Sequence, residues 1–240
     1  MNPIIYIFRS LTWRLVHKDK KLFKLQTELG YFFRSPSLLR ISLTHKSKEP
    51  RVARNYEQLE FLGDAILDHV IAEMLFREFP SAREGLLTQR RSTLVQKKYL
   101  GKIGEELGLL QYIKAGPSLN LSQPKVSERQ LANVFEALIA AMKLDGGLKP
   151  CFQLIERTVW RNRREAWKTL NYKGLLIEHC QANSLENPRF IIADTEGAEH
   201  EKLFKVAVRI GSEIHATASE VTKKAAEQAA SQKTLEIIKE

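Results

Sequence analysis

Residues 55–67 read Asn-Tyr-Glu-Gln-Leu-Glu-Phe-Leu-Gly-Asp-Ala-Ile-Leu, and this stretch decides the fold around it. Its apolar period continues through residue 76 and predicts a helix that is buried on most sides. Glu57, Glu60 and Asp64 stand at i, i+3 and i+7, so they share one stripe of this helix. Buried carboxylates repel one another and lose hydration, which indicates a compensating cation such as a hard divalent metal ion.

A carboxylate stripe is more often a solvated helix face or part of a salt-bridge network. The metal interpretation gains support from a second apolar helix at residues 131–142, where Asn133 and Glu136 share a face. Two oxygen-bearing patches on two buried helices predict one shared site. It would hold Mg²⁺, or the pair of ions about 4 Å apart that hydrolyses phosphodiesters.

Segment 57–64 resembles the signature helix of the bacterial ribonuclease III family, whose usual form is Asn-Glu-Arg-Leu-Glu-Phe-Leu-Gly-Asp. Residues 43–47, 84–88, 91–95 and 131–138 extend the resemblance. It implies an all-α, homodimeric endonuclease that cuts double-stranded RNA with Mg²⁺, for which Mn²⁺ could substitute. It also implies 5′-phosphate and 3′-hydroxyl ends with short 3′ overhangs, and cytoplasmic processing of rRNA and mRNA.

The same resemblance assigns roles by position. The implied metal ligands are Glu60, Asp64, Asn133 and Glu136. The implied catalytic residues are Glu57, Asp64 and Glu136, and Phe61 is the implied contact between subunits. His45 is expected to be a structural hydrogen-bonding residue, because a catalytic histidine needs an oriented partner.

Three positions depart from the family's usual pattern. Asn133 replaces an aspartate, and its neutral amide should lower metal affinity unless another group compensates. Tyr56 and Gln58 replace the usual residues beside the first glutamate, which should alter the contacts that support the site. Because the four acids all remain, we expect an active enzyme.

The composition favours a polyanionic partner. The chain has 240 residues, 43% hydrophobic and 28% charged, with a net charge of +10 and a pI near 9.6. The excess charge alone would also suit a ribosome-associated or merely basic protein. Cys151 and Cys180 are far apart, so they indicate neither a zinc site nor a disulfide framework.

Residues 1–22 form a basic amphipathic extension that precedes the family pattern. Its apolar run is too short to cross a membrane and no cleavage site follows it, so stable membrane insertion is not expected. It could touch a membrane or RNA, or it could equally pack on the core.

The periodic segments between residues 23 and 168 are helical and predict an all-α domain. Within it, residues 85–87 are expected to form a loop before a helix that Thr88 starts, and one helix should run from Lys149 through Trp160. Residues 169–172 are a predicted linker. Residues 173–240 alternate as α-β-β-β-α, which predicts a small α+β domain.

Lys223 and Lys224 stand in the first turn of the last predicted helix, where the helix dipole disfavours positive charge. A bound phosphate would resolve the conflict, although tolerated surface lysines are as plausible. With Gly-Ala-Glu-His at 197–200, this region resembles the double-stranded RNA-binding domain. The resemblance implies RNA contacts by four residues: Glu178, His200, Lys223 and Lys224. Gly174 replaces a common hydroxyl residue and should loosen the start of its helix.

Two other classes of function remain. A non-catalytic binder of double-stranded RNA would explain the charge and the C-terminal region, but it would leave the retained acids unexplained. A metal-dependent phosphohydrolase of small substrates would leave the RNA-binding region without a purpose.

Overall fold

The computed structural model describes residues 3–16, 19–167, 171–196 and 203–238. The chain divides into two compact units: residues 1–78 with 87–168, and residues 79–86 with 169–240. The first unit is helical, and the second carries a three-stranded antiparallel sheet with two helices. This confirms the predicted fold class, an all-α domain followed by a small α+β domain.

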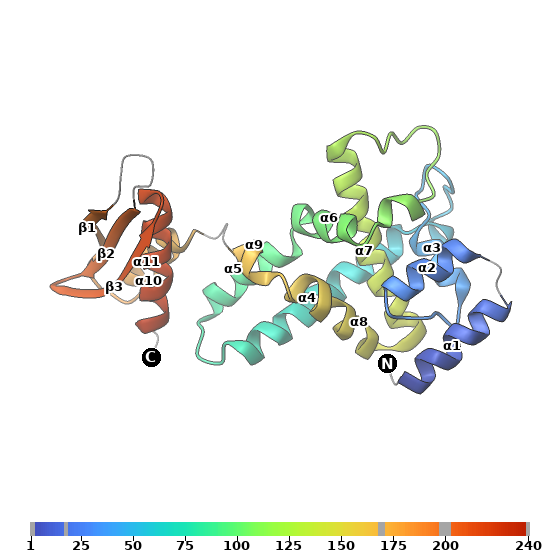
Figure 1. Ribbon diagram of the computed structural model, residues 1–240, viewed down its shortest axis with the longest axis horizontal. Coiled ribbons are helices and arrows are strands. Elements are labelled where there is room, and N and C mark those ends of the chain that lie inside the picture. Colours follow the sequence, from blue (N-terminus) through green and yellow to red (C-terminus); the bar gives the residue numbers. More distant parts are fainter. Residues whose placement is uncertain (1–2, 17–18, 168–170, 197–202, 239–240) are drawn as a thin grey trace. The chain divides into compact units, whose positions relative to one another are not determined.

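The helices of the all-α part follow one another along the chain, with the longest connections between α3 and α4 and between α6 and α7 (Figure 1). Their bounds are α1 (Pro3–Val16), α2 (Lys20–Glu28), α3 (Pro36–Ser42), α4 (Glu57–Glu78), α5 (Glu84–Val95), α6 (Lys97–Glu106), α7 (Pro124–Gly146), α8 (Leu148–Ile155) and α9 (Arg163–Trp167). Short 3₁₀ turns lie at η1 (Val52–Arg54) and η2 (Leu109–Tyr112), and a π-helical turn lies at η3 (Glu156–Trp160).

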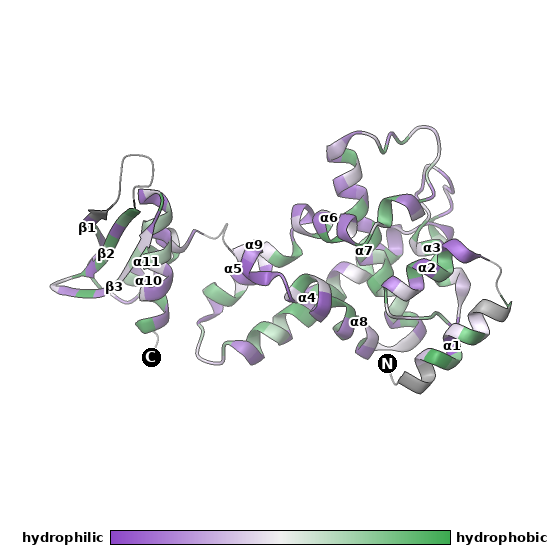
Figure 2. Ribbon diagram, viewed as in Figure 1, coloured by the Kyte–Doolittle hydropathy of each residue, from purple (hydrophilic) through white to green (hydrophobic). Residues whose placement is uncertain are grey.

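Helix α7 is the centre of this unit and packs against both α4 and α6. Residues 130–142 of α7 are all buried and most of them are apolar; the ribbon in Figure 2 is coloured by this hydropathy. Gly63 lets α4 approach α7 closely, because a β-carbon there would overlap the carbonyl oxygen of Glu136. Gly101 and Gly104 do the same for α6, where a β-carbon would lie 2.6 Å and 2.9 Å from side-chain atoms of α7.

The helix ends follow local rules. The side chain of Asn55 accepts a hydrogen bond from the Glu57 amide at 3.0 Å and so caps the start of α4. Gly147 ends α7 with a φ of +82°, a backbone conformation that glycine adopts without strain. Asp19 caps α2 by accepting from the Leu22 amide at 3.0 Å.

Two local predictions were wrong. Residues 85–87 are helical, because α5 begins at Glu84, whose charge suits a helix start; Thr88 therefore lies inside the helix. The single helix predicted from Lys149 through Trp160 is interrupted, since α8 gives way to the π-turn η3. The wider turn changes the direction of the side chains that follow it.

Helix α1 packs against residues 31–33, one of the alternatives for the N-terminal extension. Trp13 is buried and its Nε1 donates to the carbonyl oxygen of Phe33 at 3.1 Å, while Arg9 donates to that of Phe32 at 3.2 Å. Ile7, Phe8 and Leu11 remain exposed. Among the helices that the structure describes, none has the length and apolar character needed to cross a membrane.

The second unit contains α10 (Tyr172–Ala182), β1 (Arg189–Glu196), β2 (Leu203–Ile210), β3 (Glu213–Glu220) and α11 (Lys223–Ile237). The strand order is β1-β2-β3, with Val206 opposite Ile192 on one side and Ala218 on the other. Helix α11 packs on β2 and β3, and α10 packs on α11. The period-two pattern of residues 203–210 predicted β2 correctly.

Candidate active site

Acidic and amide side chains from α4 and α7 line an open pocket of about 450 Å³. On α4 these are Glu57, Glu60 and Asp64, and on α7 they are Gln130, Asn133 and Glu136. The contact at Gly63 explains the convergence, because Gly63 lies between Glu60 and Asp64 and meets the backbone of Glu136.

Glu136 is the buried member of the site, with a fully buried side chain. Burial raises its pKa from 4.5 to about 7, the ion pair with Lys97 opposes this rise, and the charges of Asp64 and Glu60 add to it. Within the described part of the chain, its Oε1 is buried and has no hydrogen-bond partner. A buried carboxylate with an unpartnered oxygen is what a bound cation would satisfy.

Lys97, which sequence reasoning missed, lies at the centre of these oxygens. Its Nζ donates to Glu136 Oε2 at 2.6 Å, to Asn133 Oδ1 at 2.9 Å and to Glu60 Oε1 at 3.2 Å. Across the described ranges, no three Asp, Glu, His or Cys side chains are grouped closely enough to hold a metal ion as placed. The oxygen atoms converge on an ammonium group.

A sequence signal for Lys97 exists. It is four and seven residues before Gly101 and Gly104, so the three residues share the face of α6 that packs on α7. Two glycines on one helix face indicate a close helix contact. A lysine on that face is therefore brought to the helix that carries Asn133 and Glu136.

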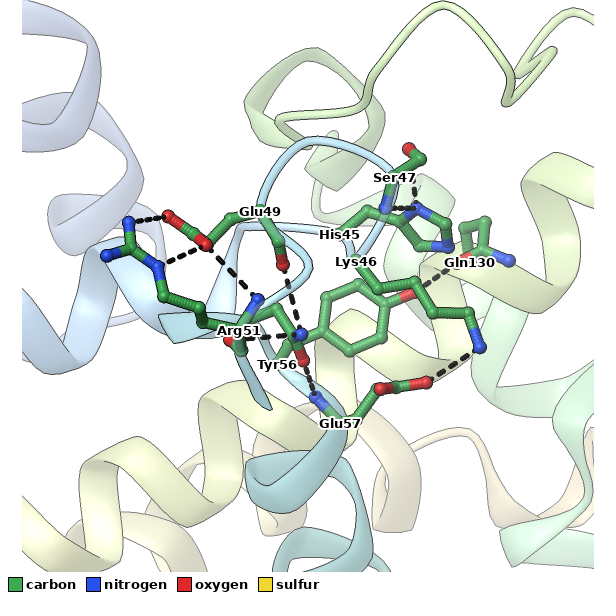
Figure 3. A network of polar contacts seen from close by, with 9 residues as sticks. His45, Lys46, Ser47, Glu49, Arg51, Tyr56, Glu57 and Gln130 are labelled. Carbon is green, nitrogen blue, oxygen red and sulfur yellow. Dashed lines mark hydrogen bonds and ion pairs between the residues drawn. The ribbon is translucent and has the colours of Figure 1, made fainter. Parts of the chain in front are cut away.

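The acids of α4 divide between two environments. Glu57 points to Lys46, whose Nζ lies 2.8 Å from Glu57 Oε1 (Figure 3). Asp64 is exposed at the pocket, and Phe61 beside it is 81% exposed. The structure thus brings together Glu60, Asn133 and Glu136, with Asp64 near them, while Glu57 pairs outside that group.

His45 and Tyr56 are among the residues that line the pocket. Both belong to the network of polar contacts in Figure 3. His45 Nδ1 lies 2.7 Å from Ser47 Oγ and accepts from the Ser47 amide at 3.0 Å. Tyr56 is buried, its hydroxyl is hydrogen-bonded to Gln130, and burial raises its pKa. Tyr56, a departure from the usual family residue, therefore connects the start of α4 to α7.

The residues expected to contact RNA lie in the second unit. Lys223 and Lys224 are exposed in the first turn of α11, which Thr222 caps by accepting from the Ala225 amide at 3.1 Å. Glu178 is exposed on α10, and His200 lies outside the described residues. Gly174 lies in the first turn of α10, and its amide donates to the capping Asn171 side chain at 3.1 Å. The looser helix start expected at Gly174 stays a prediction.

The comparisons with known proteins match both units. A Ribonuclease-III-like family model matches residues 35–162, and the double-stranded RNA binding motif matches residues 172–238. The chain is 35% identical over 227 residues to Ribonuclease 3 of Nitratiruptor sp., covering 92% of this chain and 98% of that protein. The chain belongs to the ribonuclease III family.

Other relatives agree with this assignment. Ribonuclease 3 of Helicobacter pylori is 34% identical over 239 residues, covering 97% of this chain and 98% of that protein. The solved nuclease domain of ribonuclease III from Campylobacter jejuni is 36% identical, with a TM-score of 0.55. It covers 60% of this chain and 96% of the solved one. The present ribonuclease III is therefore an endoribonuclease with a double-stranded RNA-binding domain.

Proposed function

We propose that this ribonuclease III cleaves double-stranded RNA with Mg²⁺ as its cofactor, leaving 5′-phosphate and 3′-hydroxyl ends with short 3′ overhangs. The observation that carries the proposal is the convergence of oxygen atoms from Glu60, Asn133 and Glu136 on one point, which the Lys97 ammonium occupies. The second carboxylate oxygen of Glu136, Oε1, is buried and has no hydrogen-bond partner among the described residues. The donors are all oxygen atoms, which suits a hard cation such as Mg²⁺, with Mn²⁺ as a substitute.

Four residues would hold the metal: Glu60, Asp64, Asn133 and Glu136. When bound, Mg²⁺ polarises a phosphate and lowers the pKa of the attacking water. Glu136 is fully buried where α4 meets α7, and Asp64, which is exposed at the pocket, would bind the metal through a water or orient that water. Glu57, which is paired with Lys46, would assist the binding of substrate or metal.

The RNA would be held by the second unit, which reads the shape of an A-form duplex over about 16 base pairs. Lys223 and Lys224 would bind phosphates at the start of α11, and Glu178 would meet 2′-hydroxyl groups. His200 is proposed for the minor groove on the resemblance alone. The domain boundaries stay part of the proposal: an extension at 1–22, a catalytic domain at 23–168, a linker at 169–172 and an RNA-binding domain at 173–240.

The active form would be a homodimer in which each site cuts one strand. Phe61 supports this, because a phenylalanine that is 81% exposed beside the acids favours burial in a second copy. One of the solved structures of the Campylobacter jejuni nuclease domain concerns a region involved in dimer formation. The enzyme would act in the cytoplasm on precursors of rRNA and mRNA.

The test is Mg²⁺-dependent cleavage of a long RNA duplex by the wild type, Asp64→Asn and Asn133→Asp. We expect wild-type cleavage that needs Mg²⁺ and is lost in Asp64→Asn. Asn133→Asp should lower the Mg²⁺ concentration needed for half-maximal cleavage by about tenfold, because it adds a charged ligand. RNA that is bound but left uncut by the wild type would contradict the proposal and favour a non-catalytic binder.

A further inference from the structure

Three basic side chains line the acidic pocket, Lys46, Lys97 and Arg129, and Lys97 lies among the proposed metal ligands. Lys97 Nζ lies within 2.6–3.2 Å of one oxygen each from Glu136, Asn133 and Glu60. No other lysine among the described residues has a hydrogen bond of this kind to these three side chains. The ammonium group therefore occupies the position on which the proposed metal ligands converge.

The fold holds Lys97 there against a local preference. Lys97 is the first residue of α6, where the helix dipole disfavours a cation, and the Gln96 cap makes no side-chain hydrogen bond. The close contacts at Gly101 and Gly104 fix this face of α6 on α7. Lys98, the next residue, is exposed on the same helix turn and is not among the groups that line the pocket.

The charges explain what keeps the lysine in place. Four carboxylates line the pocket, those of Glu57, Glu60, Asp64 and Glu136, and Asn133 adds no charge. Glu57 is paired with Lys46, so three carboxylates remain near Lys97. The side chain of Glu136 is fully buried, so leaving it without a cation would be unfavourable. Lys97 keeps 46% of its side chain exposed, so a rotation of its flexible stem can carry the ammonium back into solvent.

We propose that Lys97 is a tethered counter-ion that a divalent metal ion must displace from Glu60, Asn133 and Glu136. The inference rests on the metal site of the proposed function. An ammonium that donates to these oxygens at 2.6–3.2 Å blocks the approach of a metal ion, whose bonds to oxygen are about 2.1 Å long. Lys97 thus stabilises the metal-free protein and weakens its affinity for metal.

Titration calorimetry of the full-length protein with Mg²⁺ and with Mn²⁺ tests the competition. Lys97→Met removes the charge and keeps the stem, and it should tighten binding of both ions by about tenfold. Lys97→Arg keeps a cation and should stay within a few-fold of the wild type. Lys98→Met is the matched control from the adjacent position and should leave both affinities unchanged.

Because Lys97→Met could fail to fold without a cation, a second measurement uses the wild type. The wild-type lysines are reductively dimethylated with ¹³C-formaldehyde and a borohydride reductant and are followed by NMR, with Lys97→Arg to assign the Lys97 signal. Mg²⁺ should shift the Lys97 signal to the position of a solvated lysine and leave the Lys98 signal in place.

An unchanged or weaker metal affinity in Lys97→Met would overturn the inference. A Lys97 NMR signal that does not shift at saturating Mg²⁺ would also overturn it. Cleavage of the RNA duplex by the wild type distinguishes failure of the proposed role of Lys97 from failure of the proposed function. If the wild type cuts with Mg²⁺ and Lys97→Met binds metal no better, only the role of Lys97 is wrong.

Discussion

Glu136 and Lys223 are both charged residues in unfavourable positions, but the two units of the protein treat them differently. Glu136 is fully buried between packed helices, and burial raises its pKa to about 7. Lys223 is exposed in the first turn of α11. A buried charge needs a fixed partner, whereas an exposed one is solvated. Substitutions in the pocket should therefore affect chemistry and stability together, and those on α11 should affect RNA affinity alone.

Glu136→Gln is the strongest test of the contrast between buried Glu136 and exposed Lys223. The amide keeps the volume but loses the charge, so cleavage in Mg²⁺ should fall by about 10³-fold or more. Single-turnover cleavage of a saturating RNA duplex measures this, and RNA affinity should stay near that of the wild type. If Glu136→Gln bound RNA more weakly but cleaved it at an unchanged rate, the pocket would serve RNA binding and not cleavage, which contradicts the prediction.

Gly63→Ala should produce the next largest effect. The added methyl group overlaps the carbonyl oxygen of Glu136, so α4 and α7 must separate. We expect the free energy of unfolding to fall by about 2–4 kcal/mol, measured by urea denaturation. Gly85→Ala is the control, because a β-carbon at Gly85 meets no atom within 4 Å. Equal stability of the two variants would mean that the helix contact is looser than described.

The pH dependence of stability should also distinguish the units. The pKa of Glu136 is about 7 in the folded, metal-free protein and 4.5 ordinarily. Between these values the folded state holds a proton that the unfolded chain has released. The contribution of Glu136 to the free energy of unfolding therefore falls as the pH rises through this window.

Urea denaturation in EDTA at about pH 5 and about pH 8 measures that slope. Glu136→Gln should flatten it, and Lys223→Ala should leave it as in the wild type. If Glu136→Gln keeps the same pH slope of the free energy of unfolding, other groups must cause that slope.

The smallest expected effect is at α11. Lys223→Ala and Lys224→Ala should each weaken RNA binding several-fold and reduce the slope of log affinity against log salt by about 1. Fluorescence anisotropy over a salt series measures both, and the cleavage rate at saturating RNA should not change. Lys233→Ala, which removes the lysine further along α11, is the control. An identical loss in that variant would indicate a general charge effect.

Local sequence patterns predicted much of the fold. The period of 3.6 predicted α4 and α7, the glycines at 146–147 marked the end of α7, and the alternation at 203–210 marked β2. These signals work because helix and strand periods and positive-φ glycines act over a few residues. Gly85, a poor helix former, obscured the start of α5, although Glu84 suits a helix start. The π-turn before α9 was missed because the apolar period does not mark it.

The sequence by itself predicted which residues would carry the chemistry: the acid stripe of α4, the Asn133–Glu136 pair and the lysines of α11 were chosen from residue type, spacing and family resemblance. Only the tertiary structure decided how these charges are paired. It placed Lys97 among Glu60, Asn133 and Glu136, and it paired Glu57 with Lys46. Spacing determines which residues share one face of a helix, but the partner of a buried charge depends on which helices pack together. Gly63, Gly101 and Gly104 decide that packing, because the absence of a side chain lets α4 and α6 approach α7 closely.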